Sequence, residues 1–503
     1  MANLTPELEK ERVKIKKMAE DYGLDCFEVV FELITYDQMN QFAAYGGFPV
    51  RYPHWKWGME YESVSKGYEW GLSKIYEMVI NTDPCYAYLM EGNMMVDQKL
   101  VMAHVYGHCD FFKNNQWFSH TNRKMMDVMA NHATRIRRYT DRFGIETVEK
   151  FIDSCLSIEN LIDRYKPYVK PTNRSAAEVS EVEPPASLRN ERSYMEKFIN
   201  PPVAAPAKDK MEDGEKVIPL KFPERPDRDV LGFLIQHAPL KPWQQDVLNI
   251  VREEAIYFSP QGMTKIMNEG WASYWHSTMM TQKILSDAEV VDYADHHSGT
   301  VAMTPTRFNP YKVGLELFRY IEERWNKGQF GKDWNENQSF EERKNWDKKL
   351  GLGRKKIFEV RRDYNDVTFI DEFLTEDFCI RNKLFVYKFN RRTQRYEIDT
   401  RDFKAIKKQL LFQLTNWGQP IIEVVDGNFE NRGELLLKHL HEGVDMQPDY
   451  MYETMKNVFH LWTRPVNVHT LMEGEEKIYR WDGKDFKESS LGQLPVGGED
   501  RSS

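Results

Sequence analysis

The chain has 503 residues, of which 41% are hydrophobic, and a formal net charge of −9 at neutral pH. This length predicts two to four domains with sizeable cores, and the acidic balance argues against a nucleic-acid-binding surface, which needs a basic face. The five cysteines are scattered and form no C-x-x-C pair, so they indicate a reducing compartment. Because no apolar run reaches the roughly 18 residues of a membrane span and no signal-peptide core is present, we expect a cytoplasmic protein.

Helices are predicted for the first two periodic stretches, over residues 5–22 and 25–40. Glu28 and Glu32 lie four residues apart in the second stretch. Acidic side chains in an apolar setting need partners, so this pair either faces a metal or a basic group or, as is more common, is salt-bridged or half-exposed. The next predicted elements are an irregular loop over 43–55 and a helical stretch around 72–80.

The most informative stretch is a predicted helix that runs from about Asp97 through His104 and His108. The two histidines are four residues apart and project from one face, and Asp97 returns to nearly the same face. Two imidazoles one turn apart can chelate a transition metal, and a carboxylate in line can be a further ligand or accept a ring N–H. In the zinc-peptidase form, H-E-x-x-H, a general base follows the first histidine, but here that position is Val105. A chance pair that hydrogen-bonds within a core explains the spacing as well.

Further helices are predicted over 121–139 and 145–166, after which the composition changes. Ten prolines fall between residues 167 and 228 among Lys, Glu and Ser, and hydrophobic periodicity is lost. We interpret 167–228 as a linker or surface excursion. Residues 1–166 and 229–345 are then expected to form one mainly helical domain.

A second informative helix is predicted over residues 264–276. It carries Glu269, and His276 lies seven residues later on the same face. Gly270 and Ala272 are small, so they let another helix approach. A buried aromatic helix whose Glu269 is only salt-bridged explains this pattern as well. Neighbouring predictions are a helix over 243–258, a turn at 259–262, a polar loop at 295–299 and a helix over 311–326.

The pattern changes again from about residue 364. Strands are predicted at 384–389, 396–398, 420–425 and 477–481, and helices at 402–416 and 447–462. We therefore expect a smaller α+β domain over 364–488, followed by a disordered tail at 489–503. This domain holds no clustered His, Cys or acidic set, so we assign it binding or packing.

Two histidines on one helix and a glutamate on a later helix form the ligand set of glutamate-ligated zinc peptidases. On this interpretation, a zincin-like helical arrangement holds zinc or another divalent transition metal through His104, His108 and Glu269, with one position open. Because Val105 replaces the usual base, proton transfer needs another group. The candidates for that group are Glu254, His276, Asp110 and Glu32. The presence of Val105 in place of the usual glutamate is equally consistent with a site that binds a ligand without catalysis, with a different metal or with a different fold.

Four blocks of sequence resemble a known family. They are AAYGGFP and RYPHW within 43–55, NTDPCYAYLM at 81–90, HVYGHCDFFKNN at 104–115 and KIMNEGWASYWH at 265–276. In these blocks the chain resembles the stage V sporulation protein R family, and the likeness spans nearly the whole chain. The family is associated with formation of the spore cortex, a peptidoglycan layer, and also occurs in bacteria that do not sporulate. Because a cytosolic protein cannot act on cortex outside the inner forespore membrane, the resemblance implies an upstream or regulatory role.

Two hypotheses of function follow from these patterns. The first is a metal-dependent hydrolase that cleaves an amide or peptide-like bond in a peptide or muropeptide-like substrate. The second is a non-enzymatic regulatory or scaffold protein of sporulation or stress response, which acts through protein partners. Convergence of the His104, His108 and Glu269 ligand atoms to about 3–4 Å is required by the first hypothesis.

Overall fold

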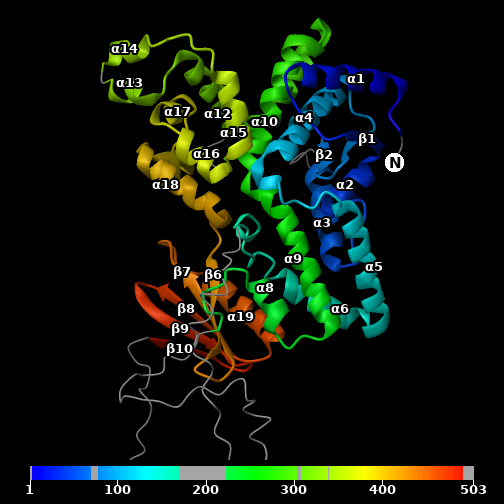
Figure 1. Cartoon of the computed structure of the whole chain (residues 1–503), viewed down its shortest axis with the longest axis vertical. Helices are drawn as coiled ribbons and strands as arrows, with labels where there is room; N and C mark the ends of the chain where they lie inside the picture. Colours follow the sequence, from blue (N-terminus) through cyan, green and yellow to red (C-terminus); the bar gives the residue numbers. More distant parts are fainter. Residues whose placement is uncertain (1–2, 70–76, 170–221, 303–307, 338, 491–503) are drawn as a thin grey trace, which may run out of the picture.

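The computed structural model describes residues 3–69, 77–169, 222–302, 308–337 and 339–490. Helices dominate the chain as far as Leu414, and a five-stranded sheet follows (Figure 1). The expectation of a mainly helical N-terminal region followed by a smaller α+β part is therefore confirmed.

The elements before the proline-rich segment are α1 (Pro6–Asp21), β1 (Val29–Ile34), α2 (Tyr36–Ala44), α3 (Trp55–Glu69), β2 (Glu77–Ile80), β3 (Cys85–Met90), α4 (Met95–Asn114), α5 (Met125–Phe143) and α6 (Ile145–Leu156). The helices after it are α8 (Val230–His237), α9 (Pro242–Met263), α10 (Lys265–Met279), α11 (Val290–Thr300), α12 (Pro310–Lys327), α13 (Gly331–Glu336), α14 (Phe340–Lys344), α15 (Gly353–Asp363), α16 (Asp366–Phe373), α17 (Glu376–Arg381) and α18 (Phe403–Leu414). Most of the predicted helices are confirmed, although the one predicted over 145–166 ends at Leu156.

A small sheet lies beside α4 and has the strand order β1-β3-β2. Strand β1 pairs parallel with β3, and β2 pairs antiparallel with it. The prediction of a helix over 25–40 is wrong, because this stretch forms β1 and the start of α2. Strand β1 carries several apolar residues in succession, a pattern that periodicity cannot distinguish from a buried helix. The helix predicted around 72–80 is also wrong where the structure describes it, since Glu77–Ile80 is β2.

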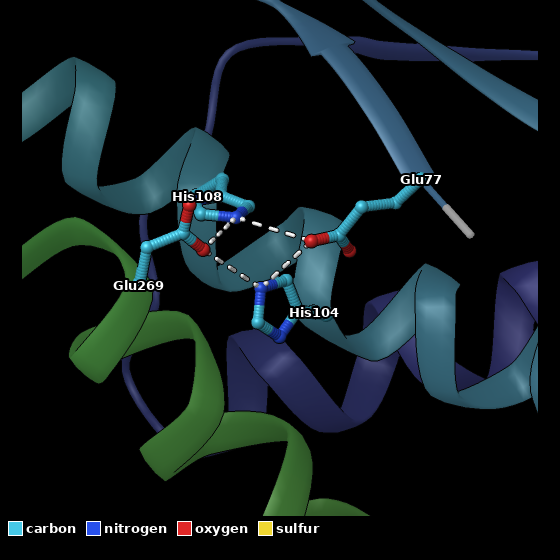
Figure 2. Close-up of side chains that lie close together, drawn as sticks. All are labelled: Glu77, His104, His108 and Glu269. Atoms are coloured by element: carbon cyan, nitrogen blue, oxygen red, sulfur yellow. Dashed lines mark ion pairs between the residues drawn. The ribbon is translucent and has the colours of Figure 1, made fainter. Parts of the chain in front are cut away.

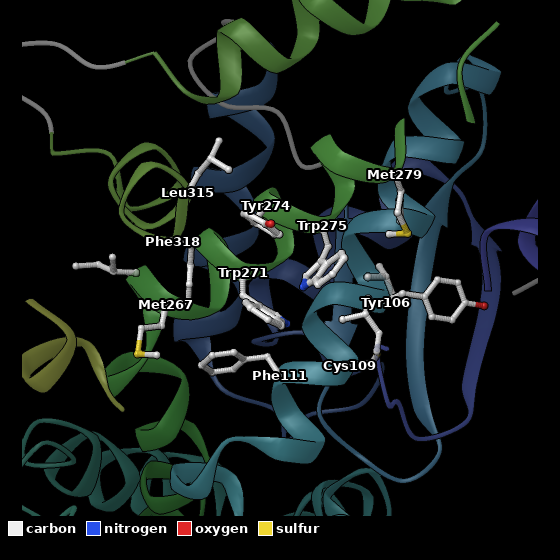
Figure 3. Close-up of a cluster of buried hydrophobic side chains, with 14 of the residues drawn as sticks. Tyr106, Cys109, Phe111, Met267, Trp271, Tyr274, Trp275, Met279, Leu315 and Phe318 are labelled. Carbon is white, nitrogen blue, oxygen red and sulfur yellow. The ribbon is translucent and has the colours of Figure 1, made fainter. Parts of the chain in front are cut away.

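Helix α10 is the centre of the helical body and packs against both α4 and α12. The close packing depends on glycines. A Cβ at Gly107 of α4 would lie 2.7 Å from the Cα of Ala272, and a Cβ at Gly270 would collide with the backbone of Gly314 in α12. The small residues on α10 therefore let two helices approach. Figure 3 shows the aromatic core that fills the remaining space, with Trp271 at its centre.

The C-terminal sheet has the order β10-β9-β8-β7-β6. Its elements, together with the preceding hairpin, are β4 (Val386–Asn390), β5 (Arg395–Thr400), β6 (Ile421–Phe429), β7 (Glu434–Leu440), α19 (Pro448–Trp462), β8 (Val466–Met472), β9 (Glu475–Trp481) and β10 (Phe486–Ser490). All four predicted strands and both predicted helices are confirmed, whereas β7, β8 and β10 were not predicted. Strand β10 includes residues 489 and 490 of the predicted tail, and residues 491–503 lie outside the described part.

Three buried cores organise the described residues, and the smallest joins the small sheet and α2 to α5 and α9. The first surrounds α4 and α10 and also takes in α16 and α18, so residues 366–414 pack with the helical body. The second joins α5, α6, α8 and α9 to the C-terminal sheet and α19. Within the proline-rich stretch, residues 170–221 lie outside the described part, and Asp227 pairs with Val424 of β6.

Two predicted loops are helical. The turn predicted at 259–262 lies inside α9, which continues past Pro260 to Met263, and the polar loop predicted at 295–299 lies inside α11. Proline and short polar runs are frequent loop signals, but Pro260 does not end α9, whose residues on both sides are packed.

Candidate metal centre

Helix α4 supplies two histidines to a buried polar cluster. It is almost wholly buried from Val96 to Phe112, and His104 and His108 expose only 2% and 4% of their surface. Imidazoles at this depth need polar partners. Because they are one turn apart, both rings face the same side of the helix, as the sequence predicted (Figure 2).

Helix α10 brings Glu269 to these rings. The close contact of Gly107 with Ala272 sets a short distance between α4 and α10. Glu269 Oε2 consequently lies 3.6 Å from His104 Nε2 and 3.5 Å from His108 Nε2. The three residues that the sequence singled out as ligands thus come together, at distances that the hypothesis of a metal site requires.

Strand β2 adds a fourth residue, Glu77, which sequence reasoning missed. Its Oε1 lies 3.0 Å from His104 Nε2 and 3.7 Å from His108 Nε2. One ligand atom from each of the four side chains lies within 4.8 Å of all the others (Figure 2). Within the described ranges, no other group of three or more His, Cys, Asp or Glu residues meets this condition.

The charges of the four side chains balance. Burial alone would raise the pKa of Glu77, but the positive charges and contacts of His104 and His108 outweigh it and lower that pKa to about 2. The same two histidines hold the pKa of Glu269 well below its usual range. In return, although burial opposes it, Glu269 and Glu77 raise the pKa of His108 to about 10. Although burial opposes it, Glu77 and Glu269 also raise the pKa of His104. The carboxylates therefore favour the protonated form of both imidazoles when no metal is bound.

Two atoms at the centre have no hydrogen-bond partner among the described residues, although both are buried. They are His104 Nε2 and Glu269 Oε2. His104 Nε2 lies 3.0 Å from Glu77 Oε1 but forms no hydrogen bond with it, and its distance of 3.6 Å from Glu269 Oε2 is too long for a good hydrogen bond. A cation placed between them would satisfy both, so the donor set and its geometry fit a divalent metal.

The second nitrogen of each ring is held by an outer partner. Asn268 Oδ1 lies 2.8 Å from His108 Nδ1, so this nitrogen carries the proton and Nε2 is left for a cation. His104 Nδ1 lies 2.7 Å from His276 Nδ1, and His276 Nε2 lies 3.2 Å from His297 Nδ1 of α11. These contacts fix the orientation of both rings.

Tyr311 of α12 lies against the cluster, and sequence reasoning also missed it. Its ring is stacked with that of His104, with 6.2 Å between the centroids. Burial, together with the negative charges of Glu269 and Glu77, raises the pKa of Tyr311. Its hydroxyl is therefore a neutral hydrogen-bond donor beside the carboxylates.

The comparisons with known proteins place this cluster in a family context. The family model described as "SpoVR like protein" matches residues 3–419, and the model "SpoVR-like C-terminal domain" matches residues 420–473. The chain belongs to the SpoVR family. The expected resemblance is thereby confirmed, and the boundary between the two SpoVR models falls one residue before β6.

A curated SpoVR-like relative gives no function. The chain is 29% identical over 482 residues to the protein named "Uncharacterized protein YcgB" of Escherichia coli (strain K12), and the match covers 89% of each chain. No solved structure matches the chain. Among the residues that the structure describes, no helix combines the length and apolar character needed to cross a bilayer.

The other predicted site residues lie in different surroundings. Asp110 pairs with Arg361 at 2.8 Å and also accepts the indole N–H of Trp271. Burial raises the pKa of Asp110 to about 6, although Arg361 opposes this shift. These contacts occupy the carboxylate within the core.

Glu254 of α9 is similarly occupied, because it pairs with Arg51 at 2.8 Å and contacts His132 at 3.1 Å. Asp97 pairs with His296 of α11. Glu32 lies half-buried on β1. Of the four candidates for proton transfer, only His276 has a contact with a cluster residue recorded in the described part of the chain.

Proposed function

We propose that this SpoVR-family protein is a metal-dependent hydrolase of amide or peptide-like bonds. The observation that supports it most is the convergence of four ligand atoms from α4, α10 and β2 to within 4.8 Å. Tetrahedral zinc with bonds near 2.0–2.1 Å places its ligand atoms about 3.3 Å apart, and Glu269 Oε2 lies 3.6 Å from His104 Nε2 and 3.5 Å from His108 Nε2. Zinc is the first choice, but two imidazoles and two carboxylates also suit other divalent transition metals.

Within this proposal, His104, His108 and Glu269 are the ligands and Glu77 is the general base. Val105 leaves α4 without the base of H-E-x-x-H, and Glu77 supplies a carboxylate beside the two imidazoles from a different element. The protonated imidazoles of His104 and His108 lower the pKa of Glu77 in the metal-free chain. A bound metal would displace those protons, so the pKa of Glu77 would rise towards its usual value and make the carboxylate a better base.

A bound divalent metal would polarise the substrate carbonyl and lower the pKa of a water molecule. The chain's own groups perform the remaining steps. Glu77 takes a proton from the attacking water as the new C–O bond forms, and it delivers that proton to the leaving nitrogen as the C–N bond breaks. Asn268 and His276 orient the two imidazoles, and the Tyr311 hydroxyl is placed to donate a hydrogen bond to developing negative charge.

The Glu77→Gln variant separates the two roles that the second carboxylate of the cluster can have. If Glu77 is the base, the variant keeps stoichiometric metal and loses at least a hundredfold in kcat on a peptide or muropeptide substrate. If Glu77 is instead a ligand, metal is lost together with activity. Glu453→Gln, at an exposed position of α19, is the matched control and changes neither quantity. Substrate cleavage by metal-loaded wild-type protein that continues unchanged in Glu77→Gln and His104→Ala would refute the proposal.

A non-enzymatic role is the second candidate, because the charge balance of the cluster lets it exist as a buried ion-pair network without metal. In that case the protein acts through protein partners, as a regulator or scaffold. Both candidates agree with a cytoplasmic protein that acts upstream of spore cortex formation, the role implied by the family resemblance. Absence of stoichiometric metal in untagged protein, with no change in His104→Ala, would favour this second candidate.

A further inference from the structure

A cavity of about 200 Å³ lies at the junction between the helical body and the C-terminal sheet. It is lined by the segment after α6, the end of α9, the start of α16 and the turn between α18 and β6. Arg164, Arg228 and Trp417 are among its lining residues. We propose that this cavity binds a small oxyanion, a phosphate or carboxylate group, through Arg164.

Arg164 carries a buried charge without a counter-ion. Only 6% of the residue is exposed, and its Nε and Nη2 are buried with no hydrogen-bond acceptor in the described part of the chain. Burial lowers the pKa of Arg164 to about 10, so the guanidinium is still charged at neutral pH. A charged group in such a position is strongly destabilising unless it is paired. An oxyanion would supply that pair, because the Nε–Nη2 edge is suited to bidentate contact with two oxygens.

Trp417 covers one face of the guanidinium. The Arg164 Cζ lies 3.2 Å from the centroid of the Trp417 ring, so stacking satisfies the face while leaving the N–H edge unpaired. Two features position this ring. Asn416 and Trp417 have φ angles of 47° and 55°, which are unfavourable for residues with a side chain. A Cβ at Gly262 would collide with the indole, so only glycine leaves room for it there.

The acidic residues that line the cavity do not neutralise Arg164. Asp366 accepts the backbone N–H groups of Ile266 and Met267 at 2.8 and 2.9 Å. Asp163 accepts the backbone N–H of Tyr165, and Glu442 is exposed. Within the described ranges, none of these carboxylates forms an ion pair with Arg164, which therefore stays available to a ligand.

The test is anion binding to the full chain, measured by isothermal titration calorimetry and by thermal melting. Inorganic phosphate and malonate are the two probes, each compared with sodium chloride at matched ionic strength. We expect one of them to bind at a single site and to raise the melting temperature, and the stronger probe identifies the oxyanion as phosphate or carboxylate. Absence of saturable binding for both probes in the wild-type chain would overturn the proposal.

Substitutions of single residues test whether the anion binds in this cavity. Arg164→Gln should weaken binding at least tenfold, and Trp417→Ala should weaken it as well. Arg362→Gln removes an exposed arginine elsewhere and should change nothing. Arg164 also lines a second cavity, beside His120, so His120→Ala should leave binding intact if the oxyanion lies on the Trp417 side. Melting without anion verifies that each variant is folded, and undiminished binding in folded Arg164→Gln would show an adventitious ion only.

Discussion

Gly107→Ala tests whether the close contact of α4 and α10 builds the site. The added Cβ would lie 2.7 Å from the Cα and 3.2 Å from the Cβ of Ala272, whereas carbon atoms pack favourably at about 3.5 Å or more. The helices must therefore separate by about 0.8 Å. Overpacking of this kind costs about 1–3 kcal/mol, and the higher helix propensity of alanine offsets about 1 kcal/mol. We expect the free energy of unfolding to fall by about 1 kcal/mol.

Gly58→Ala is the matched control, because Gly58 is an exposed position in α3 and a Cβ there meets nothing within 4 Å. This variant gains helix propensity alone, so its stability should rise by up to about 1 kcal/mol. Urea unfolding of the metal-free chain, followed by circular dichroism, compares the two midpoints. Gly107→Ala should also bind metal more weakly, since the separation moves Glu269 away from the imidazoles. An unfolding midpoint for Gly107→Ala equal to or above that of Gly58→Ala would refute this account of the interface.

Four further predictions concern the cluster and the buried carboxylate Asp110. Because the pKa of His108 is raised to about 10 without metal, zinc binding at pH 7 should release protons and tighten as pH rises, which calorimetry in buffers of different ionisation enthalpy measures. The lowered pKa of Glu77 contributes stability to the metal-free fold that is fully present above pH 4.5 and is lost as the pH falls towards 2. The raised pKa of His108 contributes stability that is fully present below pH 6.5 and is lost as the pH rises towards 10. The free energy of unfolding of the metal-free chain should therefore be greatest between pH 4.5 and 6.5, and a maximum outside this range would contradict the charge balance. Asn268→Ala should weaken metal binding about 10–100-fold, as equilibrium dialysis would show, and unchanged affinity would exclude its orienting role. Arg361→Met should cost about 3–5 kcal/mol of stability by leaving Asp110 unpaired, with metal content unchanged in the folded fraction; metal loss would instead assign Asp110 to the site.

The sequence predicted the two helices of the site because each has a local signal. The His104 helix has an uninterrupted apolar pattern with two histidines one turn apart, and the Glu269 helix carries small residues at a helix contact. Both patterns concern side chains within a single helix, where the number of residues between two side chains determines whether they lie on the same face. The ligand-bearing faces could therefore be predicted before the fold was known.

Glu77 could not be found in this way. It is a single acidic residue at the start of a four-residue strand. Whether it reaches the two histidines depends on how β2 packs beside α4. The same limit explains Asp110 and Glu254, which were candidates for proton transfer because Val105 replaces the usual base. Their partners, Arg361 and Arg51, come from distant parts of the chain, and only the tertiary fold shows them.

Strand β1 shows the corresponding limit for the fold. Its residues are apolar in succession rather than in alternation, so the period that identifies a strand is absent. Strands β7 and β8 are paired in parallel with each other and were not predicted. The strands β6 and β9 were predicted, because each contains a run of β-branched or aromatic residues.

The metal content of the full chain, purified without an affinity tag and analysed by mass spectrometry of the elements, tests the central claim most directly. The account predicts about one divalent transition metal per chain in the wild-type protein. His104→Ala and Glu269→Ala should lose it, while His460→Ala, which alters an exposed histidine on α19, should keep it. Wild-type protein without stoichiometric metal, or metal content equal in all four proteins, would contradict the claim that the cluster of Glu77, His104, His108 and Glu269 is a metal centre.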